Sequence, residues 1–177
     1  GTGGLTYGFT NAPLQPGSGG AVTAAGEGGY GGGFIRVEAA GTVSLNGSLI
    51  ANGGTSLGYT TYPSGGSGGG VFVRCRNFSG DANGAFQARG GVGINVGGGG
   101  GGGRVAVWYS VDAASAQALL ADADNPLVAQ GKEVAQTYEE FMGSINVTGG
   151  VGWNTGIVGT CVFLTVPSLS GTLFMFL

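Results

Sequence analysis

The sequence contains no histidine and few charged residues, with six Lys or Arg and nine Asp or Glu among 177 residues. Without histidine there is no Ser/His or Cys/His catalytic pair, no imidazole metal ligand and no ordinary proton shuttle. Nucleic-acid binding relies on a clustered basic surface, so this composition argues against it. The only two cysteines, Cys75 and Cys161, lack the CxxC spacing of a zinc site. They leave two alternatives open, a single disulfide in an oxidising compartment or two buried thiols.

Paired acids and phosphate-binding loops are also lacking. Six of the nine carboxylates fall within residues 112–142, and no acid pair recurs along the repeats, as a polysaccharide-cleaving site would require. Glu38 with Arg36 comes nearest to a site, and we interpret it as a solvated surface pair. The glycine run 97–103 ends in Arg104-Val105 instead of the Gly-Lys-Ser/Thr of a P-loop. We therefore predict no enzymatic activity, no cofactor and no metal.

Glycine is the residue the chain has in abundance, at 43 positions, together with 42% hydrophobic residues. The high apolar content and low charge favour a folded chain over a disordered one. Residues 31–54 align with 68–91 at an offset of 37, and a third copy opens at 101–108 and resumes at 143–150. Each unit is predicted to form three short strands followed by a Gly-rich return. Alternation in the leading strands predicts stacked inward rows of Ile35, Val37 and Ala39, of Val71, Val73 and Cys75, and of Val105, Val107 and Tyr109.

These repeats predict an all-β fold, a right-handed parallel β-helix with Gly-rich turns and a short helical insertion; a β-sandwich is the alternative. Asn46-Gly47 and Asn83-Gly84 are predicted to turn the chain through positive φ angles and to form an Asn ladder. The glycine runs are predicted return turns, where glycine permits positive φ and close backbone approach. The inward rows are offset by 36 and 34 residues, so a bulge or a change in loop length is expected.

The segment 112–142 interrupts the repeats, and it divides the chain into Gly-rich coils at 1–111, a helical insertion, and a final coil with apolar strands at 143–177. Two helices are predicted in the insertion, one capped by Asp112 and one running from Asn125-Pro126 to Gly143. One side of the second helix is predicted to dock on the flank of the coils or to contact a neighbouring subunit. That side carries Leu127, Val134, Tyr138 and Phe141.

The chain has no charge after Glu140, and its last residues are strongly apolar. Pro167 and Ser168 interrupt this tail, so we expect two buried strands, at 160–166 and 172–177, and no membrane span. Phe174 and Phe176 are expected to pair with the core or with another chain, giving a homo-oligomer or polymer. Three sequons are candidate glycosylation sites if the protein is secreted: Asn46, Asn77, which is the best placed, and Asn146.

The succession "YGFTNAPLQPGSGG", "GGGFIRVEAAGTVSLNGSLIANGG", "SGGSGGGVFVRC", "GGGGGGGRVAVWYS" and "GTCVFL" resembles the Gly-rich repeat regions of large secreted or cell-surface microbial proteins. The resemblance covers most of the chain except 112–142. It implies a parallel β-helix stalk with a surface, adhesive or fibre-forming role and no catalytic residues. We therefore expect an extracellular structural protein, a subunit or segment of a surface filament, stalk or adhesin, assembling through the insertion and the apolar tail. The rival hypothesis is a carbohydrate-binding or carbohydrate-cleaving β-helix, which would show an open groove lined by Trp108, Tyr109, Trp153 or Tyr62.

Overall fold

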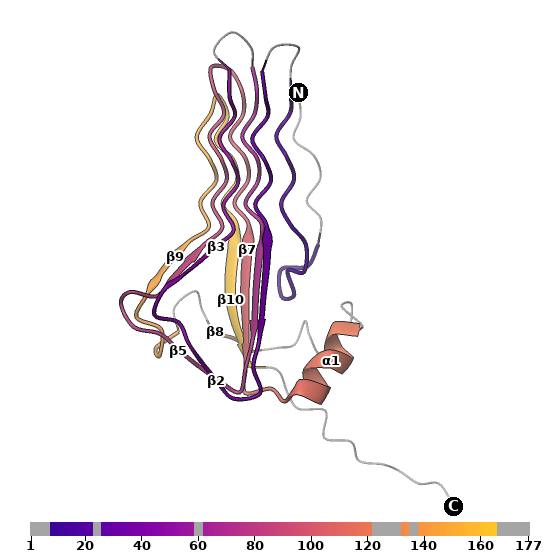
Figure 1. Ribbon diagram of the computed structural model, residues 1–177, viewed down its shortest axis with the longest axis vertical. Helices are drawn as coiled ribbons and strands as arrows, with labels where there is room; N and C mark the ends of the chain where they lie inside the picture. The colour runs from indigo at the N-terminus through magenta and orange to yellow at the C-terminus, as the bar shows by residue number, and fades with distance from the viewer. Residues whose placement is uncertain (1–7, 23–25, 59–61, 122–131, 135–137, 166–177) are drawn as a thin grey trace, which may run out of the picture.

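The computed structural model describes residues 8–22, 26–58, 62–121, 132–134 and 138–165. This part of the chain consists mainly of short strands in parallel sheets, with one short helix (Figure 1). The elements are β1 (Phe34–Glu38), β2 (Thr42–Ser44), β3 (Ser48–Ile50), β4 (Gly70–Arg74), β5 (Asn77–Ser79), β6 (Ala85–Gln87), β7 (Arg104–Tyr109), α1 (Ala113–Ala121), β8 (Lys132–Val134), β9 (Ser144–Asn146) and β10 (Thr160–Thr165).

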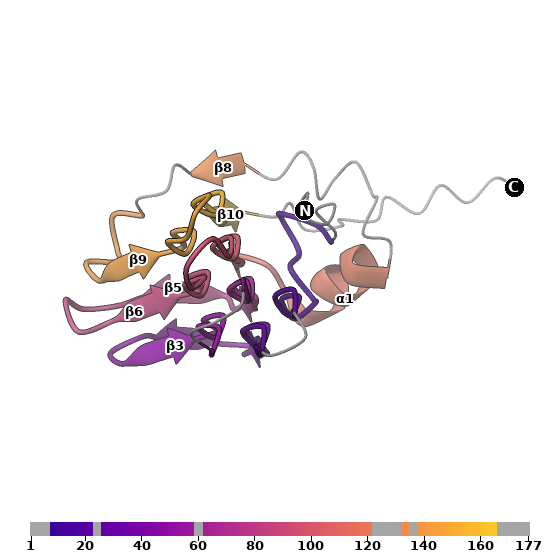
Figure 2. The same ribbon diagram turned by 90° about the horizontal axis from the view of Figure 1, so that it is seen from above.

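The strands stack in successive triplets. β1, β2 and β3 form the first triplet, and each pairs in parallel with its counterpart in the second triplet, β4, β5 and β6. β7 and β9 continue two of the three sheets, and β10 adds a further parallel strand beside β7. Strand β8 is antiparallel to β10 and closes the sheet β1-β4-β7-β10-β8. Figure 2 shows the layers one above another, with β3 and β8 at opposite ends of the stack.

The register explains the uneven offsets of the repeat. Ile35 pairs with Val71, Val43 with Phe78 and Leu49 with Phe86, which are offsets of 36, 35 and 37 residues. The two corners differ in length: residues 75–76 join β4 to β5 where 39–41 join β1 to β2, and residues 80–84 replace 45–47. Changes in loop length therefore set the register, as expected. The alignment of the glycine triplets at an offset of 37 is wrong by one residue for the leading strands.

Alternation along the leading strands creates two cores, one on each face of the five-stranded sheet. The inner face packs inside the triplets, as predicted from Ile35, Val71 and Val105. The outer face, which the sequence reading did not anticipate, is buried beneath α1 and the segment around Ala12. Both faces are apolar because a parallel sheet covered on both sides needs near-continuous hydrophobic strands. The outer core contains Ala12, Phe72, Ala106, Trp108, Val111, Ala116, Leu119, Val162 and Leu164.

A bundle of glycine-rich arms projects from the strands and forms the upper half of the molecule in Figure 1. We call it the glycine bundle; its described arms are residues 17–22, 26–33, 51–58, 62–69, 88–103 and 147–159. The three hairpins between strands, 51–69, 88–103 and 147–159, have 19, 16 and 13 residues. The second and third hairpins are thus each three residues shorter than the one before. Three residues are one turn of a polyproline II helix, so shortening by three preserves which residues face a neighbour.

Hydrogen bonds within the bundle follow the same three-residue period. In the arm 62–69, Ser64 donates its N–H to Ala21, Gly65 to Gly98 and Gly66 to Gly54. The next three residues repeat these directions, because Ser67, Gly68 and Gly69 donate to the same three neighbouring arms, at Ser18, Gly101 and Ala51. The period is that of a polyproline II helix, a conformation without internal hydrogen bonds, and here lateral bonds to neighbouring arms satisfy the backbone donors.

Two expectations about backbone conformation are wrong. Among the described residues, only Gly8, Gly58, Asn95 and Ser110 have positive φ, so neither Asn-Gly step nor the run 97–103 uses that conformation. Asn46 lies level with Asp81, whose N–H donates to its Oδ1 at 3.3 Å, and not with Asn83. The second reason predicted for glycine, close backbone approach, is confirmed. A Cβ on Gly66 would collide with the carbonyl oxygen of Tyr30, and one on Gly100 with that of Gly66.

Candidate functional site

The insertion closes one end of the strand stack. Its first helix begins as predicted, because the Asp112 side chain accepts hydrogen bonds from the backbone N–H and the hydroxyl of Ser115. These bonds hold the pKa of Asp112 below its ordinary value. The second predicted helix is wrong over 132–134, which form strand β8, while 122–131 lie outside the described residues. Pairing with the free edge of β10 outweighs helical periodicity in that stretch.

Tyr138 and Phe141 fill the core where the third triplet lacks a middle strand. Phe141 is 8% exposed, and its ring centroid lies 5.8 Å from that of Phe78 and 5.3 Å from that of Phe86. Tyr138 stacks on Phe163 at 5.4 Å, and burial together with Glu140 raises the pKa of Tyr138 to about 12. The structure therefore packs Phe141 against its own chain, which confirms the docking alternative for this residue and corrects its assignment as an assembly contact. We call this end, with β8, Tyr138 and Phe141, the closed end.

The structure says less about the other residues proposed as assembly contacts. Val134 belongs to β8, while Leu127, Phe174 and Phe176 lie outside the described residues. The first of the two expected tail strands is present as β10.

An open apolar pocket of about 420 Å³ lies at the closed end, between β9, the start of β10 and the rings of Tyr138 and Phe141. Its lining is Tyr138, Phe141, Gly143, Ile145, Val147, Thr148, Val158 and Cys161.

At the opposite end of the stack no strand within the described residues pairs with the outer edges, and we call it the open end. It consists of the outer edges of β1, β2 and β3, each the terminal strand of its sheet. The inward side chains of this first triplet, among them Ile35, Val37 and Leu49, are only partly buried. In the second triplet their partners Val71, Val73 and Phe86 have no exposed surface.

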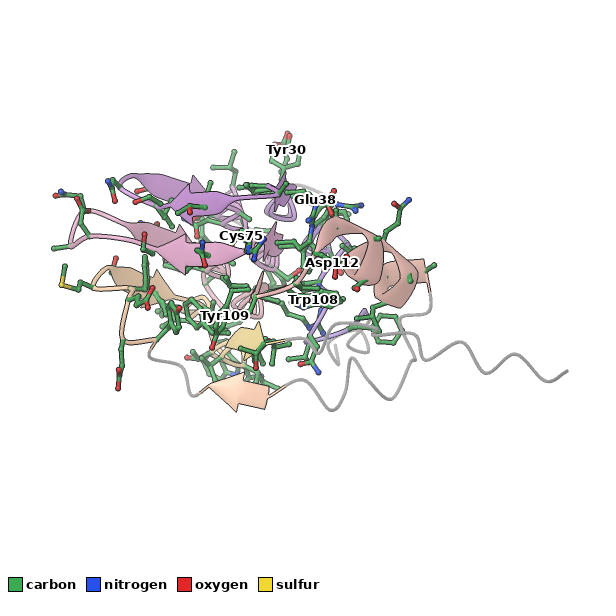
Figure 3. All side chains as sticks on the ribbon, turned by 90° about the horizontal axis from the view of Figure 1, so that it is seen from below. Tyr30, Glu38, Cys75, Trp108, Tyr109 and Asp112 are labelled. Carbon is green, nitrogen blue, oxygen red and sulfur yellow. The ribbon has the colours of Figure 1, made fainter. Side chains whose placement is uncertain are left out.

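Tyr30 marks this end in the glycine bundle. The register of β1 with β4 and of β4 with β7 places Tyr30 in one column with Gly66 and Gly100. At the two glycines a side chain would strike the preceding arm, whereas Tyr30 is 77% exposed and points away from the stack (Figure 3). Sequence analysis did not identify Tyr30, because it aligned the glycine triplets one residue out of register. The correct signal is a large side chain in a column otherwise held by glycine.

Glu38 is the centre of a small group of charged side chains at the surface. Glu38 accepts a hydrogen bond from Arg36 at 3.0 Å, and this bond lowers the pKa of Glu38. Arg74 contributes a second, longer contact of 3.5 Å to the same oxygen. No three metal-ligating side chains gather among the residues that the structure describes. No helix within the same residues is long and apolar enough to cross a membrane.

Cys75 and Cys161 are free, buried thiols. Cys161 is level with Val105, and Cys75 lies just beyond Arg74, which is level with Trp108, so the two differ by four positions along the sheet and by two strands. At ~3.3 Å per residue and ~4.8 Å per strand, their Cα atoms are ~16 Å apart, beyond the ~7 Å limit of a disulfide. Burial raises the pKa of Cys75 to about 11 and that of Cys161 to about 12. The thiol alternative is therefore the one the structure shows.

The four aromatic residues suggested for a glycan groove are dispersed. Trp108 is fully buried, and its Nε1–H donates to the carbonyl of Asn11 at 2.6 Å. Tyr109 packs on Tyr138 with ring centroids 4.7 Å apart. Tyr62 and Trp153 are 60% and 71% exposed and lie on different hairpins of the glycine bundle. The groove expected of a glycan-active β-helix is not built from these residues.

The sequons differ in their surroundings. Asn46 and Asn77 are exposed, and the Nδ2 of Asn77 approaches Thr42 Oγ1 at 3.5 Å across β2 and β5. Asn146 is half-buried at the end of β9, and its Oδ1 accepts a hydrogen bond from the Thr148 hydroxyl at 2.9 Å. Asn77 thus remains the best-placed candidate for modification.

Comparison with known proteins adds no further assignment: no protein-family model, no curated protein and no solved structure matches this chain. The interpretation of its function therefore depends on its own residues and geometry.

Proposed function

We propose that this chain is an extracellular structural protein, a subunit or segment of a surface filament, stalk or adhesin. The observation that carries the proposal is the glycine bundle, in which successive residues of one arm donate hydrogen bonds to three different neighbours. A body held by lateral backbone bonds in three directions resists bending without requiring an apolar core. Such a body suits a spacer that displays its tip away from its base.

We further propose that the strand triplets are coils of a parallel β-helix and that the bundle is a side branch of those coils. The support is the repeated parallel pairing of all three strands of one triplet with those of the next. The β-sandwiches that form the alternative are built from antiparallel sheets, whereas here only β8 pairs antiparallel within the sheets of the described residues. The insertion then acts as a terminal cap, which repeat proteins need to cover the last apolar layer.

The test of the structural role is where the protein resides in its native cells. Antibodies raised against the purified chain, used for immunogold electron microscopy on intact cells, are expected to label surface stalks, fibres or the outer envelope. Pre-immune serum serves as the control. Label confined to the cell interior, with intact cells unlabelled, would refute an extracellular role.

Glycan binding is a second candidate, favoured only by the exposed rings of Trp153 and Tyr62 on the bundle. Exposed aromatic rings offer stacking surfaces for sugar rings. A glycan array probed with the wild-type chain and with Trp153→Ala measures this directly. Binding that disappears in the variant supports a glycan-binding tip, whereas an array without signal removes this candidate and leaves the structural role standing.

A further inference from the structure

We propose that the open end is a self-association surface at which two copies of this chain meet about a two-fold axis, with β1 antiparallel to the partner's β1. The proposal deepens the structural role proposed above and relies on it for its biological meaning. It places assembly at the first triplet and away from the insertion.

Three strand edges face the same way at this end. β1, β2 and β3 each pair with a described strand on one side only, toward the second triplet. An uncovered strand edge presents a row of N–H and C=O groups that pairs readily with another chain. The end therefore offers three such rows around one apolar centre.

The apolar side chains at this centre form a layer of the core that is covered by the second triplet on one side only. Val43 and Leu49 pair with Phe78 and Phe86, which are 1% and 0% exposed, yet both residues of the first triplet remain partly accessible. A layer identical to the first triplet has the same shape and the same apolar interior. A second copy is thus an occupant whose chemistry matches that of the surface.

A two-fold axis accounts for the outline of this surface. Figure 1 shows the triplet as a triangle, with β1 along one side and the short strands β2 and β3 meeting at the far corner. Rotation about an axis through the middle of β1 and the far corner places β1 on the partner's β1 and β2 on the partner's β3. β2 and β3 each have three residues, so the two short sides match in length.

Charge complementarity selects the register. When Val37 lies opposite Val37 of the partner subunit, Arg36 lies opposite the partner's Glu38, and the two-fold axis repeats this pair. Arg36 and Glu38 are already in contact in one chain at 3.0 Å, with 44% and 34% of their side chains exposed. Opposite charges directly across an antiparallel pair stabilise it, and like charges destabilise it. The register centred on Arg36 would instead bring the two arginines together.

Head-to-tail stacking is disfavoured at both ends. In a head-to-tail stack, an arm of the next copy would have to approach residue 30 as closely as Gly66 does from the other side. The side chain of Tyr30 occupies that space. At the other end β8 occupies the edge of β10. An isologous pair closes upon itself, whereas head-to-tail contacts give open filaments.

The experiment is light scattering coupled to size exclusion, over a range of concentrations, on the wild-type chain and three charge variants. The wild type is expected at twice the 17.2 kDa mass of one chain. Arg36→Glu sets two carboxylates against each other across the axis, the introduced one and the partner's Glu38, and is expected to weaken the dimer at least about tenfold. The double variant Arg36→Glu with Glu38→Arg restores opposite charges across the axis and is expected to restore the dimer.

Arg89→Glu is the matched control, because Arg89 is exposed and belongs to the arm 88–103 of the glycine bundle, outside the first triplet. It should leave the dimer unchanged, and circular dichroism should show all variants folded. A wild type that is monomeric up to ~100 μM overturns the proposal, as does an Arg36→Glu variant that remains dimeric. Open-ended polymers overturn the two-fold arrangement in favour of head-to-tail stacking. Because the readout is mass in solution, its failure is distinct from a failure of surface labelling.

Discussion

The backbone N–H of Gly66 donates to the carbonyl oxygen of Gly54 at 3.0 Å, across the two arms of one hairpin. The Cα of Gly66 also faces the carbonyl oxygen of Tyr30 in the neighbouring arm, with no room for a Cβ. Each arm of the bundle therefore approaches its neighbours as closely as backbone atoms allow. This packing, and not turn geometry, explains the glycine content of the bundle.

Gly66→Ala is expected to destabilise the chain by about 1–3 kcal/mol, as overpacking does. Gly101→Ala is the matched control, because the nearest heavy atom to its Cβ position is the Ile157 oxygen at 3.8 Å. With space available, the control should be neutral or stabilising by up to about 1 kcal/mol. Urea unfolding followed by tryptophan fluorescence measures both. Equal losses for the two variants would contradict the close-packing explanation.

Phe141→Ala is expected to lower the free energy of unfolding by about 3–5 kcal/mol, because it removes the aromatic ring that covers Phe78 and Phe86 at the closed end. Its neighbour Met142 is 71% exposed, so Met142→Ala should change stability by less than about 0.5 kcal/mol. Thermal and urea unfolding of the pair measure the difference. A Phe141→Ala variant as stable as Met142→Ala would refute the capping role.

Cys75 and Cys161 should resist thiol reagents in the folded protein. Raised pKa values of about 11 and about 12 leave little thiolate at pH 8, and both groups are buried. Ellman's reagent without denaturant is expected to react negligibly within an hour, and two thiols should react at once in guanidinium. The absence of titratable thiols in unreduced, denatured protein would show a disulfide instead.

Alkaline pH should destabilise the fold through the same groups. The pKa of Cys161 rises from 9.0 to about 12 on folding, so its thiol ionises first in the unfolded chain. Its contribution to stability is complete below pH 9 and is lost as pH rises toward 12, by about 4 kcal/mol at ~1.4 kcal/mol per pKa unit. Urea unfolding at stepped pH should show this decline above pH 9, with a shallower slope in Cys161→Ala. An identical slope in both proteins would exclude Cys161 as a cause.

The inner core was predictable from sequence because strand alternation is local. Side chains two apart share a face, so Ile35 and Val37, or Val71 and Val73, had to point the same way once the strand was recognised. The outer core was not predictable in the same way. Trp108 and Leu119 are brought together by the docking of α1 on the sheet, a contact that no period in the sequence encodes.

Part of the cap was also accessible from sequence. Asp112 and Ser115 have the spacing of a helix N-terminus, and the capping bonds depend on nothing outside that turn. The strand β8 was misassigned, since the helical spacing of apolar residues there says nothing about a free sheet edge nearby. A three-residue strand is stabilised by its partner β10 and not by its own propensity.

By itself the sequence determined the repeat, the parallel order of the leading strands' apolar rows, the start of α1 and the lack of histidine, which excludes a Ser/His or Cys/His pair. These properties depend on residue type and short spacing. Only the tertiary structure decided which arms the glycines pack against, that Cys75 and Cys161 lie too far apart to bond, and that Tyr30 stands at the open end. Each of these depends on the register between strands that are far apart in the sequence, such as β1 with β4 at an offset of 36 residues and β7 with β10 at an offset of 56, where a shift of one residue changes which groups meet.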